Sequence, residues 1–142
     1  LLEDRELIST HYYNSPLDRK TNEKKYMKQQ KFFDSLKKIP KLKFVLCRMQ
    51  KLKIHEKVIY QVKEDDISLA VDMVKQAYKN EYDRAILISN DGDFVPAVLA
   101  VQEAGKKVEN TGFEDKFSYH LKQKCADFRK LTKKELEPFF QK

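Results

Sequence analysis

Two carboxylates follow directly on the most hydrophobic stretch of the chain. Residues 86–94 read ILISNDGDF, so Asp91 and Asp93 stand between one apolar run and the next. One aspartate is enough to cap a helix, and we expect Asp93 to cap the helix that follows. Two neighbouring carboxylates repel each other unless a cation or hydrogen-bond donors compensate them. The pair therefore indicates either simple helix architecture or a site for a hard cation such as Mg²⁺ or Mn²⁺, which prefers oxygen ligands.

A second acidic group precedes another expected helix. Glu64, Asp65 and Asp66 follow the apolar segment VIYQV, and Asp65 or Asp66 is expected to cap the helix after it. In a parallel α/β sheet the carboxyl ends of the strands meet at one edge, where ligands bind. We therefore expect Asp66 to converge with Asp91 and Asp93 on one divalent ion. Such an ion would activate a water molecule and stabilise charge on a phosphate.

The role of Asp72 is open between three interpretations. It lies six residues after Asp66, which on a helix corresponds to about 9 Å along the axis and roughly 120° around it. The two carboxylates therefore do not easily share one ion. Asp72 could bind a second ion, hydrogen-bond a metal ligand, or face solvent.

The elements that must position these residues alternate between strands and helices. Asn22 is the expected cap of the first helix, and Gly105 the expected stop of a later one. The alternation predicts an α/β fold with a mainly parallel sheet, and the apolar segment 84–89 is typical of a strand buried on both faces. The expected strands are 6–15, 43–52, 56–62, 84–89 and 106–110, with the second and third as a candidate hairpin, and the expected helices are 22–38, 64–80, 94–104 and 115–131.

Charge is distributed unevenly along the 142 residues, whose net charge is +7. Residues 19–57 hold 14 basic and three acidic side chains, and residues 116–142 hold eight and three. Between them, residues 64–115 hold five basic and 12 acidic side chains. A polyanion could be held by the basic flanks and presented to the acidic centre through a cation. The alternative is a set of solvated, lysine-rich helix faces.

Several other classes of protein are disfavoured. There is no apolar run near the roughly 18 residues that span a membrane, and no signal segment. Cys47 and Cys125 are far apart and predict buried thiols in a reducing compartment, so we expect a cytoplasmic protein. The three histidines show no metal-ligand spacing. Ser89 lacks the flanking glycines of a hydrolase nucleophile, so we interpret it as a hydroxyl that hydrogen-bonds the carboxylates or a phosphate.

Residues 63–109, KEDDISLAVDMVKQAYKNEYDRAILISNDGDFVPAVLAVQEAGKKVE, resemble the core of an NYN domain of the LabA-like branch, within the PIN-like nuclease superfamily. SYHLKQKCADF at 118–128 resembles the family's later Ser-x-x-Leu run that ends in Ala-Asp-x-Phe, and HYYNSP resembles its tyrosine-rich second strand. The matching core residues are Lys63, Asp66-Ile67, Leu69-Ala70, Asp72-Met73, the Ser-x-Asp-x-Asp-Phe run at 89–94, and Gly105-Lys106-Lys107-Val108.

The resemblance implies a PIN-like, Rossmannoid three-layer α/β fold with a mainly parallel central sheet. It also implies a ribonuclease that hydrolyses RNA phosphodiesters through an aspartate-bound Mg²⁺ or Mn²⁺. The expected partner is RNA, single-stranded or structured, with no membrane, and a homodimer is one possible assembly. The expected catalytic residues are Asp66, Asp91 and Asp93, the metal ligands are these three with Asp72, and the substrate-binding residues are Ser89, Asn90, Lys63, Lys24, Lys25 and Lys28.

The beginning of the chain departs from the family pattern. The family opens with a strand that carries an aspartate of the metal site, whereas this chain begins LLEDRELIST and continues into the match to the second strand. We therefore expect residues 1–142 to be a single NYN domain that is incomplete at its N-terminus and lacks the first strand. This departure motivates an alternative, a non-catalytic RNA- or protein-binding module on the same fold. A weaker alternative is a phosphohydrolase of small phosphate esters.

Overall fold

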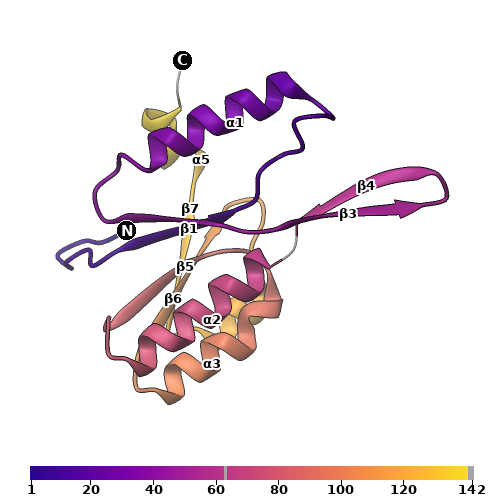
Figure 1. The fold of residues 1–142 in the computed structure, drawn as a ribbon. Helices are drawn as coiled ribbons and strands as arrows, with labels where there is room; N and C mark the ends of the chain where they lie inside the picture. Colours follow the sequence, from indigo (N-terminus) through magenta and orange to yellow (C-terminus); the bar gives the residue numbers. More distant parts are fainter. Residues whose placement is uncertain (63, 141–142) are drawn as a thin grey trace. The chain divides into compact units, whose positions relative to one another are not determined.

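The computed structural model describes residues 1–62 and 64–140 and shows a mixed α/β fold with parallel strands (Figure 1). The chain divides into two compact units, the first covering Leu1–Leu69 and the second Ala70–Lys142. The expected α/β class with parallel pairing is confirmed. Within the described residues, no helix is long and apolar enough to cross a membrane.

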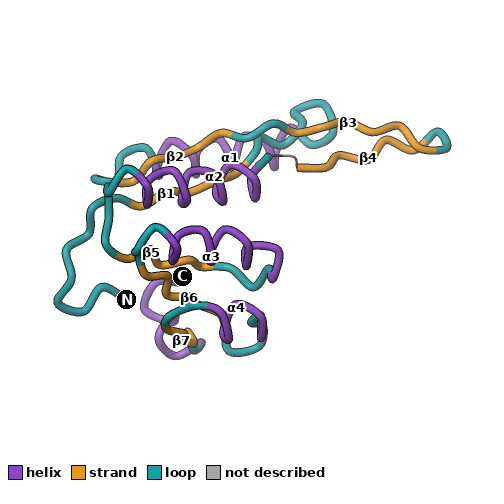
Figure 2. Tube along the Cα trace, turned by 90° about the horizontal axis from the view of Figure 1, so that it is seen from below, coloured by secondary structure: helices purple, strands orange, loops and turns teal. Residues whose placement is uncertain are grey.

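The first unit is built around one parallel strand pair. β1 (Thr10–Asn14) pairs with β2 (Leu42–Leu46), and α1 (Glu23–Leu36) connects them and runs beside this small sheet (Figures 1 and 2). α1 begins where the sequence predicts, because the Lys25 amide donates to the Asn22 side chain at 2.9 Å. Phe33 of α1 is buried, and its ring lies 4.4 Å from that of Phe44 on β2. This contact fastens the helix to the sheet.

A hairpin follows the parallel pair in the first unit. β3 (Met49–Ile54) and β4 (Lys57–Val62) run antiparallel and side by side (Figure 2). The two turn residues have positive φ, 44° at His55 and 62° at Glu56, as a two-residue hairpin of this kind requires. The expected strand 43–52 is therefore two strands, interrupted at Cys47. The Cys47 amide still bonds the Asn14 carbonyl at 2.7 Å, after which the chain leaves the parallel pair for the hairpin.

The second unit contains a three-stranded parallel sheet in the order β5-β6-β7. Val98, Val101, Val108 and Leu121 are fully buried and form the centre of its core. Its elements are the main part of α2 (Asp65–Tyr78), β5 (Arg84–Ile88), η1 (Gly92–Phe94), α3 (Val95–Glu103), β6 (Lys107–Phe113), α4 (Tyr119–Lys124), β7 (Asp127–Leu131), α5 (Lys133–Leu136) and η2 (Glu137–Phe139). The strands alternate with helices, as in consecutive βαβ units.

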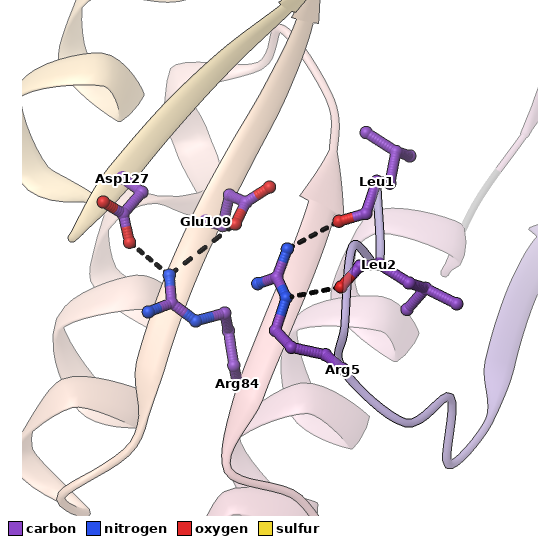
Figure 3. Close-up of polar contacts among 6 residues, drawn as sticks. All are labelled: Leu1, Leu2, Arg5, Arg84, Glu109 and Asp127. Carbon is purple, nitrogen blue, oxygen red and sulfur yellow. Dashed lines mark hydrogen bonds and ion pairs between the residues drawn. The ribbon is translucent and has the colours of Figure 1, made fainter.

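An arginine joins the amino-terminal halves of the three strands. Arg84 of β5 pairs with Asp127 of β7, and its Nη1 lies 3.6 Å from a carboxylate oxygen of the buried Glu109 on β6 (Figure 3). In the first unit, Arg5 folds the N-terminal turn by donating from Nε to the Leu2 carbonyl at 3.0 Å (Figure 3). Arg84 thus pairs with a carboxylate on each of the other two strands of the second unit's sheet.

The single helix expected over 115–131 is wrong. The segment forms the short helix α4 and then the strand β7, because the chain becomes extended at Cys125 (φ −73°, ψ 153°) and the Ala126 amide bonds the Val108 carbonyl at 2.9 Å. Phe117, Leu121 and Cys125 have helical spacing, but Phe128 belongs to a strand. Pairing with β6, which local spacing does not show, decides the structure here.

Helix ends follow the sequence at one place and depart from it at another. Gly105 has φ +78° and ends α3, with its amide bonding the Gln102 carbonyl and the Lys106 amide bonding the Val101 carbonyl. The expectation that Asp65 or Asp66 caps α2 is wrong. Both lie inside the first turn of α2, where a carboxylate stabilises the helix dipole instead.

Candidate functional site

The turn after β5 presents two exposed carboxylates. The Asp91 amide donates to Ser89 Oγ at 3.1 Å, and the Asp93 amide donates to Asp91 Oδ1 at 2.9 Å. Asp91 has an extended backbone (φ −90°, ψ 116°) and is the cap of η1. These bonds fix the Asp91–Gly92–Asp93 turn at the carboxyl end of β5, the edge at which parallel sheets bind ligands. The expectation that this strand is buried on both faces is wrong, because Leu87 is its only buried residue and Ile88 is 52% exposed.

The expected cap assignment is reversed by this geometry. We expected Asp93 to be the cap and Asp91 to be the additional carboxylate, but Asp91 caps η1 and Asp93 lies in its first turn. Among the described residues, the Asp93 carboxylate makes no hydrogen bond or ion pair, and its side chain is exposed. Helix capping therefore does not explain the carboxylate of Asp93. Asp91 uses only its Oδ1 for the capping bond, so its second carboxylate oxygen takes no part in the cap.

Asn110 supports the turn from the neighbouring strand, and sequence reasoning missed it. This side chain is completely buried on β6, the middle strand, and its Nδ2 donates to the Leu87 carbonyl at 3.1 Å and the Ser89 carbonyl at 2.9 Å. Within the described part of the chain, Asn110 Oδ1 and the hydroxyl of the buried Thr111 have no hydrogen-bond partner. A polar residue within a short predicted strand gave no indication of this role, because it depends on the register of β6 against β5.

The start of α4 lies against the same turn. A Cβ atom placed on Gly92 would lie 3.4 Å from Ser118 Oγ and 3.7 Å from His120 Nδ1. Ser118 caps α4, with its hydroxyl accepting from the Leu121 amide at 3.3 Å. The sequence gives no reason to expect His120 near the aspartates, because the two segments are 27 residues apart and meet only through the parallel sheet.

An open hollow of about 540 Å³ lies at the turn. It is lined by Ile88, Ser89, Asn90 and Asp91. The polar groups that line it are oxygen-rich, and the hollow faces solvent, so it is suited to an ion or to part of an extended polymer rather than to an enclosed small molecule.

The acidic corner of the first unit has different surroundings. Asp66 is exposed in the first turn of α2, and Glu64, just before it, pairs with Arg48 at 3.0 Å. Cys47 is buried nearby, and burial and the charge of Asp65 raise the pKa of its thiol. Cys47 and Cys125 are both free and buried, as expected, and burial raises the pKa of Cys125 to about 11. Neither thiol is therefore a good nucleophile at neutral pH.

The structure divides the expected site residues between the two units. Ser89, Asn90, Asp91 and Asp93 come together in the turn after β5 of the second unit. Within residues 1–62 and 64–140, no group of three His, Cys, Asp or Glu side chains is arranged to hold a metal ion. The convergence of three aspartates stays a prediction. Of the others, Asp66 lies in the first unit, Asp72 lies in the second, Lys24, Lys25 and Lys28 are exposed on α1, and Lys63 lies outside the described residues.

A family model described as NYN domain matches residues 1–132 of the chain. The chain belongs to the NYN domain family. The match covers nearly the whole chain, and the mixed α/β structure is consistent with the PIN-like superfamily that the sequence resembles. Membership of this family indicates a nuclease-like fold. The Asp91–Gly92–Asp93 turn lies within the matched residues.

Two individual proteins are similar to this NYN chain. An uncharacterised protein of Methanocaldococcus jannaschii is 36% identical over 63 residues, which are 44% of this chain and 26% of the relative. The match thus spans about a quarter of that relative's length. A crystal structure of a protein of unknown function from Vibrio parahaemolyticus matches with a TM-score of 0.69 and 23% identity, over 89% of this chain and 70% of that chain. At this identity the second likeness shows the fold alone.

Proposed function

We propose that this NYN protein is a Mg²⁺- or Mn²⁺-dependent ribonuclease that hydrolyses RNA phosphodiesters. The observation that carries the proposal is the turn after β5, where Asp91 and Asp93 are both exposed and only one carboxylate oxygen is used as a cap. The family match supports a nuclease and an RNA substrate. We also assign the two units to one NYN domain, because the family match runs through both of them. The LabA-like branch, a cytoplasmic location and a homodimer stay predictions.

The donor atoms fit a hard divalent ion. Asp91 and Asp93 offer carboxylate oxygens only, and Mg²⁺ commonly takes one or two protein carboxylates while keeping several waters. Asp91 and Asp93 would hold the ion at the turn after β5, and Asp66 and Asp72 stay ligands predicted from the sequence. When bound, the ion supplies an activated water and stabilises negative charge on the phosphate.

Other side chains have roles that do not depend on metal chemistry. Asn110 is proposed to keep the end of β5 in position, because its amide bonds the carbonyls on either side of Ile88. Ser89 and Asn90 line the hollow and would hydrogen-bond a phosphate. The exposed lysines of α1 would neutralise backbone phosphates without reading sequence, and Lys63, outside the described residues, stays a predicted phosphate contact. The lysines meant are Lys24, Lys25 and Lys28.

Replacement of Asp91 by Asn tests this proposal. Asparagine is also a good cap, so Asp91→Asn keeps an oxygen for the Asp93 amide and removes only the charge. We expect Mn²⁺-dependent cleavage of a labelled single-stranded RNA to fall at least about 100-fold, equivalent to about 2.7 kcal/mol of transition-state stabilisation. Asp83→Asn is the matched control, because Asp83 is a fully exposed aspartate of the same unit. Unchanged cleavage in Asp91→Asn would exclude this site.

A non-catalytic RNA-binding module is the second candidate. It is favoured by one observation, that the described residues include no three-residue metal-binding group. This candidate predicts RNA binding that persists in EDTA and no cleavage by pure protein with any divalent ion. Cleavage that requires Mn²⁺ and is lost in Asp91→Asn would exclude it.

A further inference from the structure

Aromatic and basic side chains gather at the end of the second unit that carries α4 and β7. The aromatic–lysine patch consists of Phe117, Tyr119, Lys122, Phe128 and Lys130, and neither the aspartate site nor the core accounts for it. Phe117 contacts both other rings, with centroids 5.0 Å from Tyr119 and 5.4 Å from Phe128. The rings are tilted by 48° and 47°. They form a continuous aromatic surface rather than scattered exposed residues.

Lysine ammonium groups lie directly over these rings. Lys122 Nζ is 5.8 Å from the Phe117 centroid and 5.5 Å from that of Phe128, and Lys130 Nζ is 5.0 Å from that of Phe117. These distances are within cation–π range, so the positive charges are held at the rings. Local geometry explains the arrangement, since Phe128 and Lys130 are two apart on β7 and face the same side, and Tyr119 and Lys122 are one turn apart on α4.

The charge of this region is almost entirely positive. Residues 116–131 contain five basic side chains and one carboxylate, that of Asp127. Asp127, next to Phe128 at the start of β7, is already paired with Arg84 of β5 (Figure 3). The patch therefore has no carboxylate of its own segment left to neutralise Lys122 and Lys130, and a polyanion complements it.

One ring is exposed, while the rings behind it are held in place. Tyr119 is 67% exposed, whereas Phe117 and Phe128 are half-buried. Gly112 explains why Phe117 can lie so close to β6, since a Cβ on Gly112 would come within 2.7 Å of the Phe117 Cβ. A tyrosine ring on a fixed aromatic base has little conformational entropy to lose when a second flat group stacks on it.

We propose that the aromatic–lysine patch binds single-stranded nucleic acid, with a base stacked on Tyr119 and backbone phosphates at Lys122 and Lys130. Aromatic rings interleaved with lysines are the elements from which sequence-tolerant single-strand sites are built. The patch continues into the proposed catalytic turn, because Ser118, between Phe117 and Tyr119, lies against Gly92. That the strand is RNA rests on the proposed function. An apolar protein partner fits less well, because it would bury both lysine charges without partners.

The test is a binding measurement that excludes cleavage. Fluorescence anisotropy of a labelled oligouridylate is recorded with the intact protein in EDTA. Loss of one stacked base is worth about a fivefold or greater loss of affinity, so Tyr119→Ala should weaken binding by at least about fivefold. Tyr119→Phe should bind like the parent, since the ring is retained. Tyr78→Ala is the matched control, because Tyr78 is a 64% exposed tyrosine of the same unit outside the patch, and it should not change affinity.

The lysine contribution is read from the salt dependence. Lys122→Gln with Lys130→Gln removes two phosphate contacts, so the slope of log K against log salt should become shallower by about 1.4. Lys75→Gln on α2 with Lys79→Gln, just after the end of α2, is the control pair, and it should leave the slope unchanged. The melting temperature of each variant is measured as well. A value equal to that of the parent shows that the change in salt dependence comes from lost phosphate contacts and not from unfolding.

Three outcomes would overturn the proposal. The first is an affinity of Tyr119→Ala equal to that of Tyr78→Ala. The second is equal binding of a perfect RNA duplex, which offers no unstacked base. The third is full competition by polyglutamate, which would identify an acidic protein partner. Tyr119-dependent binding by a protein that cleaves nothing in Mn²⁺ would support this proposal while contradicting the proposed ribonuclease activity.

Discussion

The two units use the same strand–helix–strand element but bury it to different degrees. Among the residues whose burial is described, the buried hydrophobic ones in the first unit are Phe33, Leu36 and Cys47, whereas in the second they are Met73, Ala77, Leu87, Phe94, Val98, Val101, Val108, Leu121 and Cys125. Leu46 on β2 is 61% exposed, while Leu87 on the parallel strand β5 is 4% exposed. The second unit thus has a core of its own, and the parallel pair of the first unit leaves apolar side chains uncovered.

The difference extends to the carboxylates. Asp91 is held within the second unit, by Ser89 and by a turn whose strand end is bonded to the buried Asn110. Asp66 is an exposed side chain in the first turn of α2, in the first unit. We infer that the second unit holds Asp91 and its turn in a fixed geometry, which is what metal binding and phosphate positioning require.

The largest expected effect compares the two parallel sheets with one residue type. Leu87→Ala should destabilise the protein by about 2–5 kcal/mol, because it leaves a cavity in a closed core. Leu46→Ala should change stability by less than about 1 kcal/mol, because the side chain is mainly exposed. Urea unfolding of both variants measures the two values. Equal losses would break the comparison between the units.

A smaller effect separates two neighbouring buried polar residues on β6. Asn110→Leu keeps the size roughly constant and removes the donors to the Leu87 and Ser89 carbonyls, so stability should fall by about 1–3 kcal/mol. Thr111→Val removes a buried hydroxyl that has no partner in the described part of the chain, and should be neutral or stabilising. Thermal unfolding followed by circular dichroism measures both. A loss in Thr111→Val as large as that in Asn110→Leu would show that the hydrogen bonds of Asn110 are not what holds the strand end.

The smallest expected difference is in local opening, and the two thiols report it. Cys47 lies in the first unit and Cys125 in the second, and both are buried with a raised pKa, so neither reacts readily in the closed state. Because fewer of the described hydrophobic side chains are buried in the first unit, Cys47 should become reactive at a lower urea concentration than Cys125. Pulsed alkylation followed by peptide mass spectrometry gives the two midpoints. Coincident midpoints would mean that the units open together.

Local sequence patterns predicted the parts of the fold that local interactions decide. The strand 84–88, the helix after it and the stop at Gly105 follow from apolar runs and glycine geometry. The segment 115–131 was wrong because its apolar spacing fits a helix, while hydrogen bonds to β6 make its second half a strand. The single strand expected over 43–52 was wrong for a similar reason. Its first half pairs in parallel with β1, and its second half pairs with β4 in the hairpin.

The sequence was enough to predict the aspartates of the candidate site, but not the side chains from other elements that lie against their turn. Residue type and spacing were enough to single out Asp91 and Asp93. The reversed capping depends on the extended backbone of Asp91, which the Asp-Gly-Asp spacing does not specify. Asn110 and His120 reach the turn from other elements, so only the register of the sheet brings them there. Supports of this kind arise from tertiary structure and leave no local pattern.

The central proposal is that the turn after β5 holds one divalent ion through Asp91 and Asp93. The most direct test is the Mn²⁺ affinity of the intact protein, measured by electron paramagnetic resonance of the free ion, for the parent, Asp91→Asn, Asp93→Asn and the double variant. We predict that each single change weakens binding at least about tenfold, and that the double variant loses clearly less than the sum, with a coupling of about 1 kcal/mol or more. Additive losses, or an Asp91→Asn variant that binds Mn²⁺ like the parent, would contradict the proposal.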